Sequence, residues 1–325
     1  MNGIIRWYNQ NRKQVWKVIG IFAVIIIVIQ LIQGITVKNE NKKLENVLNS
    51  GKNEIKTNTI IINDEKSTIT GSKLSNSQKK VLTVIDEFVE YCNNKQVSEA
   101  YNILSEDCKN QIYSSENIFQ EKYLNKIFDG SVRNILAENW VGNIYKVKFR
   151  EDALSTGIYD TDNVIQDYIT GTKDENGDIR LNINGYIGKY EINKQDEKNN
   201  IKITVIEKHQ YMDYETYVFE IKNNSNNTIL LNDIQNEDLY NQNAMYLEDK
   251  NNIQYNSYTH ELSEGQLKIL SRETRKISIK YHNKYSSNKK IENIVFSKII
   301  LDYNEYLKTE NTSDYTNYGI IQIDL

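Results

Sequence analysis

Proline is absent from this chain of 325 residues, and histidine and cysteine are scarce, with three and two residues. Average usage near 5% would put roughly 16 prolines in a chain of this length. So few histidines and cysteines leave little material for a metal cluster or a disulfide framework, and we expect neither a metal nor a cofactor. The depleted Pro, Ala, Gly and Arg have GC-rich codons, and the abundant Asn, Ile and Lys have AT-rich ones. This pattern indicates a low-GC genome such as that of a Firmicute.

An excess of positive charge is also missing. The chain has 44 acidic and 40 basic side chains, a net charge of −4 and a pI near 5.6. Proteins that bind nucleic acid usually present a dominant basic face. We therefore expect no nucleic-acid partner.

Residues 18–37 form a run of twenty residues without a charged side chain. As a helix this run is about 30 Å long, which matches the hydrocarbon core of a bilayer. Residues 1–17 carry four cations and no acid, so the positive-inside rule predicts a cytoplasmic N-terminus and a chain that is otherwise extracellular. Since no small-residue cleavage site follows the run, an uncleaved membrane anchor is favoured over a signal peptide.

Two polar residues, Gln30 and Gln33, interrupt the apolar run near its outer end. They could bind a partner helix and make a homo-oligomer, or simply reach water at the interface. Residues 38–76 are rich in Asn, Lys, Ser and Thr and are predicted to be a flexible linker. Residues 38–325 carry a net charge of −8, as expected for soluble, weakly acidic domains.

Three amphipathic helices are predicted in residues 77–128. Apolar residues recur at helical spacing from Val81 to Cys92, again in 100–104, and again in 115–128.

The period then changes to two, in residues 141–149, 164–172 and 179–192. Between the last two segments, Asn176 and Gly177 suit the turn of a β-hairpin. The sequence therefore predicts three helices followed by a curved antiparallel sheet.

The segment FVEYCNNKQVSEAYNILSEDCKNQIY at 88–113, followed by ENIFQEKYLNKIF at 116–128 and a run of strands, resembles the nuclear-transport-factor-2-like domains of extracytoplasmic Firmicute proteins. The resemblance covers residues 77–195 and depends most on AYNILSEDCK. It implies a cone in which a bent sheet wraps around a long helix and encloses an apolar pocket. The family includes enzymes and non-catalytic assembly modules. Among the latter are scaffold proteins of conjugation and type IV secretion systems, which have the same order of one membrane helix and then such a domain.

After a charged joint at residues 194–198, residues 200–325 show about seven short alternating strands, the last around Ile320, Ile321 and Ile323. This spacing predicts an all-β, immunoglobulin-like sandwich. The Cys–Trp–Cys signature of true immunoglobulin domains is absent.

The three histidines, His209, His260 and His282, lie in the β part at irregular spacing. They match no metal-ligand motif, and we expect them at the surface or at strand ends. The helical half has no histidine, so a serine or cysteine nucleophile there would have no imidazole base.

The resemblance suggests one other chemistry, because ketosteroid isomerase, an enzyme of the same cone family, uses an Asp base with a Tyr and a protonated Asp. Asp86, Asp107, Tyr101 and Tyr123 lie on the helices that would wall such a cone. Their spacing singles out no pair, so we predict no catalytic residue and no enzyme.

The two cysteines, Cys92 and Cys108, both lie in the helical half. Outside the cell such a pair could form a disulfide, and two buried thiols are the alternative.

Two acidic segments, 160–163 and 174–178, resemble calcium loops at first sight. Both lack a glycine at the required position, so we interpret them as turns. Lys289 and Lys290 are interpreted as part of a solvated loop.

Taken together, these patterns predict an α+β protein of the cell membrane: a cytoplasmic segment (1–17), a membrane helix (18–37), a linker (38–76), a cone domain (77–195) and a β-sandwich (200–325). We expect a structural or assembly role through contact with other envelope proteins. The alternative is a binding module that holds a small apolar ligand or a peptide in the cone pocket.

Overall fold

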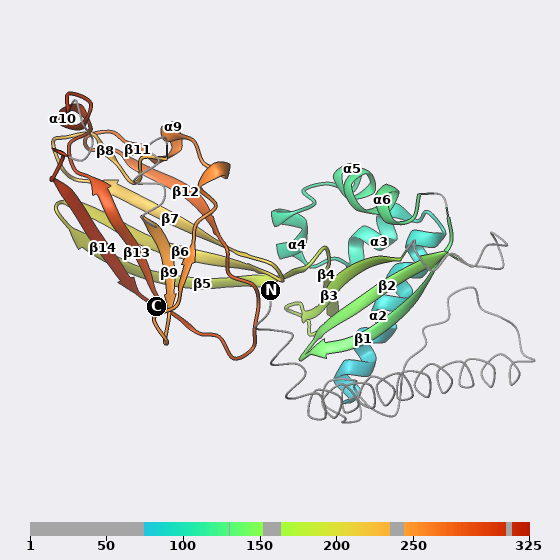
Figure 1. The fold of residues 1–325 in the computed structure, drawn as a ribbon. Coiled ribbons are helices and arrows are strands. Elements are labelled where there is room, and N and C mark those ends of the chain that lie inside the picture. Colours follow the sequence, from blue (N-terminus) through green and yellow to red (C-terminus); the bar gives the residue numbers. More distant parts are fainter. Residues whose placement is uncertain (1–74, 130, 152–163, 235–243, 310–313) are drawn as a thin grey trace, which may run out of the picture. The chain divides into compact units, whose positions relative to one another are not determined.

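The computed structural model describes residues 75–129, 131–151, 164–234, 244–309 and 314–325. The predicted cytoplasmic segment, the predicted membrane helix and all but the last two residues of the predicted linker lie outside these ranges. Within them, no helix is long and apolar enough to span a membrane. The described chain is of the α+β class, with helices first and mainly antiparallel strands after them, as predicted (Figure 1).

Helix α2 (Asn76–Asn93) begins with a reciprocal cap. The Gln78 N–H donates to the Ser75 hydroxyl, and the Ser75 N–H donates to the Gln78 side chain. This capping box satisfies two backbone donors that would otherwise lack partners. The predicted apolar face is confirmed, because the buried residues of the helix are Val81, Leu82, Ile85, Phe88, Val89 and Cys92.

The remaining helices of this domain are short. They are α3 (Val97–Ile103), α4 (Glu106–Gln111), α5 (Glu116–Phe119), the π-helical turn η1 (Gln120–Leu124) and α6 (Asn125–Ile127). The last three are consecutive and form the third predicted helix. Within the π-helical turn, the Tyr123 ring lies nearly parallel to that of Phe119, with centroids 5.8 Å apart.

The first sheet contains four strands in sequence order. They are β1 (Arg133–Val141), β2 (Ile144–Glu151), β3 (Ile165–Lys173) and β4 (Ile179–Asn182). The strand predicted over residues 141–149 is confirmed from Ile144 onward as β2, with Tyr145, Val147 and Phe149 buried. Its start was wrong, because Gly142, with φ at +56°, lies in a turn between β1 and β2. Strand β1 was not predicted. Its buried positions include Arg133 and Ala137, so its sequence does not show a clear alternation of hydrophobic and polar residues.

A long hairpin of β5 (Tyr186–Lys198) and β6 (Ile201–Tyr211) follows. The charged segment 194–198, predicted as a joint between domains, is instead the end of β5, paired with β6. The turn residues Asn199 and Asn200 have φ near +56° and +59°, as the favoured two-residue hairpin turn requires.

Two further sheets pack face to face. One has the order β12–β7–β6–β5; in the other, β13 pairs with β8, β9 and β14. The strands are β7 (Glu215–Asn223), β8 (Ile229–Leu230), β9 (Met245–Asp249), β10 (Gln254–Asn256), β11 (Lys268–Ile269), β12 (Thr274–Tyr281), β13 (Ile291–Ile300) and β14 (Tyr318–Asp324). Within the described ranges of this region, the strands are connected by three short helical turns: η2 (Thr259–Glu261), α9 (Glu264–Leu267) and α10 (Tyr303–Tyr306).

Two hydrophobic clusters hold these elements together. The first joins the helices to the first sheet and includes Tyr186 and Tyr211 from the β5–β6 hairpin. The second lies between the two later sheets, where the Phe219 and Phe296 rings meet edge to face at 5.4 Å. In β14 the pleat buries Ile321 and Ile323 and leaves Ile320 52% exposed.

Candidate functional site

The interior of the helical domain, where the cone family would hold a ligand, is filled with aromatic side chains. Phe88, Tyr113, Phe119 and Tyr123 are each no more than 2% exposed, and their ring centroids lie 5.6 to 6.2 Å apart. None of the four lines any of the three cavities described below. These rings are part of the first hydrophobic cluster, which fills the interior of this domain.

A buried carboxylate, Asp167 in β3, lies against this cluster. The Tyr123 hydroxyl donates to its Oδ2 at 2.8 Å. The N–H groups of Asn184 and Gly185 donate to its two oxygens at 2.9 and 3.0 Å. Burial raises the pKa of Asp167, and the hydrogen bonds oppose that rise. Because both oxygens accept hydrogen bonds, Asp167 is suited to fixing the turn after β4.

The four residues suggested by the family's enzymes are not brought together as a reactive pair. Tyr101 donates to the carbonyl of Tyr113 at 2.7 Å, and Asp107 Oδ1 lies 3.7 Å from Lys189 Nζ. Asp86 is half-buried on α2, and Tyr123 pairs with Asp167. No sequence pattern indicated Asp167, since a polar residue within an alternating strand normally faces solvent.

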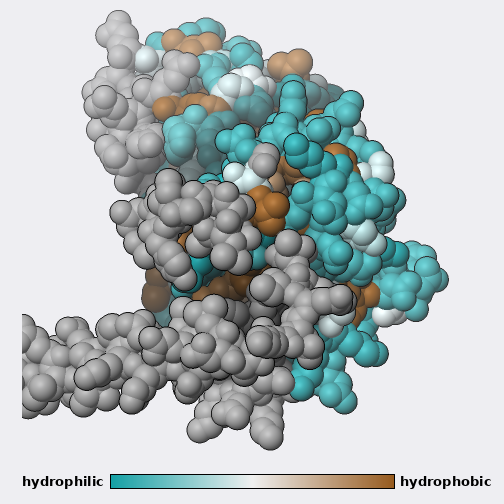
Figure 2. Space-filling view, turned by 90° about the vertical axis from the view of Figure 1, so that its right-hand side faces the viewer, coloured by the Kyte–Doolittle hydropathy of each residue, from teal (hydrophilic) through white to brown (hydrophobic). Residues whose placement is uncertain are grey.

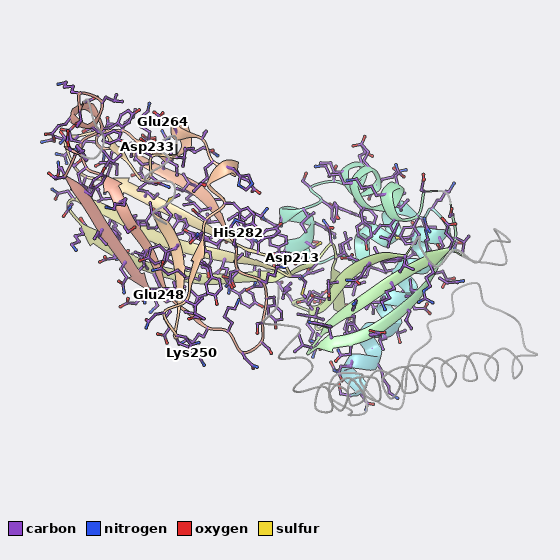
Figure 3. All side chains as sticks on the ribbon, in the orientation of Figure 1. Asp213, Asp233, Glu248, Lys250, Glu264 and His282 are labelled. Carbon is purple, nitrogen blue, oxygen red and sulfur yellow. The ribbon has the colours of Figure 1, made fainter. Side chains whose placement is uncertain are left out.

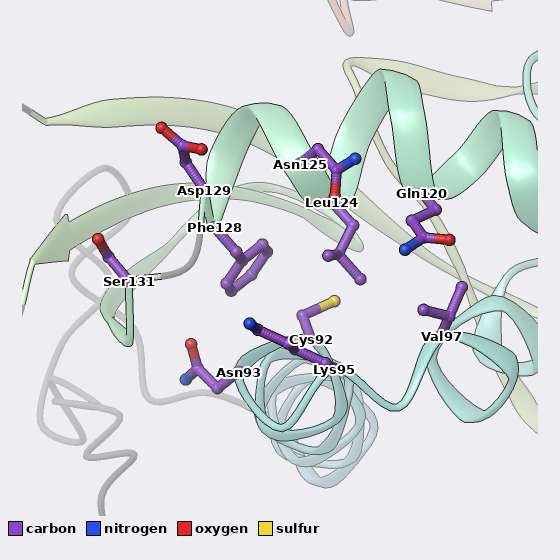
Figure 4. A pocket seen from close by; sticks show the side chains of 10 residues that line it. All are labelled: Cys92, Asn93, Lys95, Val97, Gln120, Leu124, Asn125, Phe128, Asp129 and Ser131. Atoms are coloured by element: carbon purple, nitrogen blue, oxygen red, sulfur yellow. The ribbon is translucent and has the colours of Figure 1, made fainter.

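Both cysteines are buried and free. Burial raises the pKa of each thiol, to about 12 for Cys108, so both are protonated at neutral pH. Cys92 lines a cavity of about 200 Å³ between the end of α2 and the segment from η1 to α6. Figure 4 shows its side chain extending from α2 toward Leu124, with Phe128 and Val97 on either side.

The prediction that all three histidines lie at the surface or at strand ends was wrong for His209. Its ring is 6% exposed within β6, with the Tyr186 hydroxyl 3.2 Å from Nδ1 and Glu207 Oε1 3.1 Å from Nε2. His209 is therefore a buried histidine that packs between residues of β5 and β6.

The other two histidines are exposed and lie near each other. The ring of His282, labelled in Figure 3, stacks on that of Tyr258 with centroids 3.4 Å apart. Burial, then the nearby charges of His260 and Lys280, lower the pKa of His282. Among the described residues, no three His, Cys, Asp or Glu side chains are grouped so that they could hold a metal ion.

The segment 174–178 is a hairpin turn, as interpreted from the sequence. Asp174 Oδ1 accepts hydrogen bonds from the N–H groups of Asn176 and Asp178, and Oδ2 accepts from Arg180. The similar segment 160–163 lies outside the described residues. The 174–178 turn borders an open cavity of about 600 Å³ whose charged side chains are of both signs.

The third cavity, of about 370 Å³, has a predominantly basic lining. We call it the lysine groove and define it by Tyr190, Lys208, Glu215, Lys284, Lys289 and Lys290. The interpretation of Lys289 and Lys290 as loop residues is confirmed, but only Lys290 is exposed. The Lys289 side chain is half-buried and its ammonium group lies 4.4 Å from the centre of the Tyr255 ring.

Comparisons of the chain with protein-family models, with curated proteins and with solved structures find no match.

Proposed function

We propose that the chain is a single-pass membrane protein whose extracellular domains act by protein–protein contact. It would be a structural or assembly component of an envelope or conjugation-like complex. In this proposal the first domain is nuclear-transport-factor-2-like and the second is an immunoglobulin-like sandwich. The order of elements supports this: helices precede a four-stranded antiparallel sheet, and two face-to-face sheets follow.

The observation that carries the proposal is the filled interior of the first domain. A cone that binds a ligand or performs catalysis keeps convergent polar groups around an open pocket. Here the aromatic rings around Phe119 fill the interior, and the oxygens of Asp167 accept hydrogen bonds from Tyr123 and from the backbone. Aromatic rings and a carboxylate that are buried and paired in this way stabilise the fold. A binding function would then depend on residues at the surface.

The surface offers several features of the kind that interfaces use. The face shown in Figure 2 is mainly hydrophilic, with hydrophobic residues in small separate patches. Large apolar side chains that remain exposed include Trp140, Tyr190 and Leu307, at 39%, 49% and 63%. Tyrosine and tryptophan are favoured as anchors of protein–protein contacts.

The second candidate function is a binding module for a small apolar ligand. The cavity beside Cys92 favours it, since Val97, Leu124 and Phe128 contribute apolar walls. Its volume of about 200 Å³ is below the roughly 300–1,000 Å³ that is usual for ligand pockets. We therefore rank this function second.

The test is crosslinking of the tagged full-length chain in its native membrane, followed by purification and mass spectrometry. The matched control carries residues 1–76 fused to an unrelated folded domain, so it has the predicted anchor and linker alone. We expect the same envelope proteins to be recovered repeatedly with the full chain and not with the control. Recovery of the full chain by itself would overturn the assembly role and favour the cavity beside Cys92.

A further inference from the structure

Among its side chains, the lysine groove combines four cations with one carboxylate, Glu215, which is paired with Lys208. Glu215 is 4% exposed. Its Oε2 accepts from the Tyr217 hydroxyl at 2.8 Å, and its Oε1 lies 3.3 Å from Lys208 Nζ. The remaining three lysines leave the groove with an excess of positive charge, in a chain whose net charge is −4.

Two of those three lysines have no partner of opposite charge among the residues that the structure describes. Lys284 and Lys290 are exposed, and neither side chain forms an ion pair or a hydrogen bond with another described residue. Lys289 is held in place by neutral groups, because its Nζ donates to Asn283 Oδ1 at 2.7 Å and to the Lys284 carbonyl at 3.0 Å. Its two hydrogen-bond partners are neutral, and the nearby carboxylates of Glu215 and Asp249 offset part of its charge. The positive charge that is open to a ligand therefore comes mainly from Lys284 and Lys290.

The groove also has an apolar side. The Tyr190 ring is 49% exposed, with Lys208 Nζ 5.2 Å from its centre. Ile192 and Ile291 line the same cavity and are half-buried. A free inorganic anion uses none of this apolar surface. It would also occupy little of a 370 Å³ cavity that has room for about a dozen waters.

We propose that the lysine groove binds an acidic segment of a partner protein, whose carboxylates meet Lys284, Lys289 and Lys290 while an apolar side chain packs on Tyr190. The inference rests on the proposed assembly function and specifies the chemistry of the partner. Charge complementarity supplies orientation and speed of association, and the aromatic contact supplies affinity.

The probe is a fluorescein-labelled octapeptide of alternating Glu and Leu, titrated with the purified full-length chain in non-ionic detergent and read by fluorescence anisotropy. Peptides with Gln or Lys in place of Glu are the charge controls. We expect the Glu peptide alone to bind, and its affinity to fall as salt rises from about 50 to 300 mM.

Two double variants locate the site. Lys284→Glu with Lys290→Glu should weaken binding about tenfold or more, since it reverses two charges in the groove. Lys222→Glu with Lys276→Glu makes the same change at two exposed lysines outside the groove, and we expect little effect. Tyr190→Ala should also weaken binding, because the peptide loses its aromatic contact. Circular dichroism confirms that each variant is folded.

Three results would overturn the proposal: equal binding by the groove variant and the wild type, displacement of the peptide by inorganic phosphate, or self-association of the wild type that the groove variant abolishes. The second would indicate a small-anion site, and the third a second copy of this chain as the occupant. The crosslinking experiment, repeated with the groove variant, separates a failure of the groove proposal from a failure of the proposed assembly function. Undiminished recovery of the envelope proteins would reject the groove and retain the assembly function.

Discussion

The hydrogen bond from Tyr123 to Asp167 joins the π-helical turn η1 to strand β3, and both residues are buried. We predict that Tyr123→Phe lowers the free energy of unfolding by about 1–3 kcal/mol, because a buried carboxylate loses a donor that nothing replaces. Urea unfolding followed by circular dichroism measures the change. Tyr91→Phe is the matched control, since its hydroxyl donates to Glu87 on an exposed helix surface. An equally large effect of Tyr91→Phe would contradict the prediction.

The raised pKa of Asp167 makes stability depend on pH. Its pKa in the folded chain lies above the ordinary value of 3.8, so its contribution is fully present below that pH and is lost as the pH rises through the raised value. Asp167→Asn does not titrate. We therefore predict that the stability of this variant relative to wild type improves as the pH is raised from about 4 to 8.

Urea midpoints measured across that pH range test the Asp167 prediction. Glu175→Gln, at an exposed carboxylate in the β3–β4 turn, is the control and should follow the wild-type curve. Parallel curves for Asp167→Asn and the wild type would show that Asp167 does not carry the pH dependence.

Single residues were the least predictable feature of the candidate site. Tyr123 was identified from its place on an apolar helix face, yet its partner Asp167 was not. A buried carboxylate is stable only where tertiary structure supplies donors, and here two of them are backbone N–H groups from beyond β4. His209 was misplaced for the same reason, since its burial depends on Tyr186, a residue of the neighbouring strand.

At the scale of elements, the distance between α2 and β3 depends on one glycine. A Cβ on Gly171 would lie 2.5 and 2.6 Å from the two methyl carbons of Val81. We predict that Gly171→Ala destabilises the chain by about 1–3 kcal/mol, because the stiff valine cannot move away within a packed core. Combining it with Val81→Ala should cost less than the sum of the two single changes.

Gly265→Ala is the control for that series. A Cβ at Gly265 would meet nothing within 4 Å, and the residue lies in helix α9, so the change should be neutral or slightly stabilising. If the changes in unfolding free energy of Gly171→Ala and Val81→Ala were strictly additive, a steric clash between a Cβ at position 171 and Val81 would not be the cause of the destabilisation.

The elements were predicted well where one periodicity extends over many residues. Helix α2 keeps the spacing of Val81, Ile85 and Phe88 throughout, whereas β5 changes its pattern when it enters its charged half. That half is an edge strand, where exposed charges oppose pairing with another chain. The sequence pattern of a charged run is therefore the same in an edge strand as in a linker, and the pattern alone cannot distinguish the two.

The corrected β5 leads to a proteolysis prediction. Lys194 is paired with β6 along its backbone, whereas Lys284 and Lys290 lie in a segment without regular structure. Limited trypsin digestion should therefore cut after Lys284 or Lys290 before it cuts after Lys194, because a protease must bind its substrate as an extended free chain. Mass spectrometry of the first fragments gives the order. An early cut at Lys194 would contradict this prediction and would support the interpretation of residues 194–198 as a joint between domains.

At the scale of the whole molecule, composition and periodicity were sufficient to predict the α+β class and the order of helices before sheets. They could not show that the two hydrophobic clusters share one hairpin. Tyr186 and Tyr211, at the open end of that hairpin, belong to the first cluster, and Ile201 and Val205 belong to the second. Such sharing depends on register between distant strands, which no local pattern encodes.

The predicted orientation in the membrane can be tested because the natural cysteines are inert. Cys92 and Cys108 are buried, and burial raises their pKa, so a maleimide should find almost no thiolate in the folded chain. A single cysteine introduced at Asn2 or at Ser287 then reports on one side of the membrane. We predict that a membrane-impermeant maleimide labels Ser287→Cys on intact cells and labels Asn2→Cys only after permeabilisation.

The reverse pattern would place the folded domains in the cytoplasm and reject an extracellular assembly role. Alkylation of the wild-type chain after denaturation without reductant settles the state of its cysteines in the same preparation. Two alkylated thiols per chain are expected from the buried free pair. No alkylation would mean that the chain had formed the disulfide which an oxidising compartment permits, and that the first core rearranges to bring Cys92 and Cys108 together.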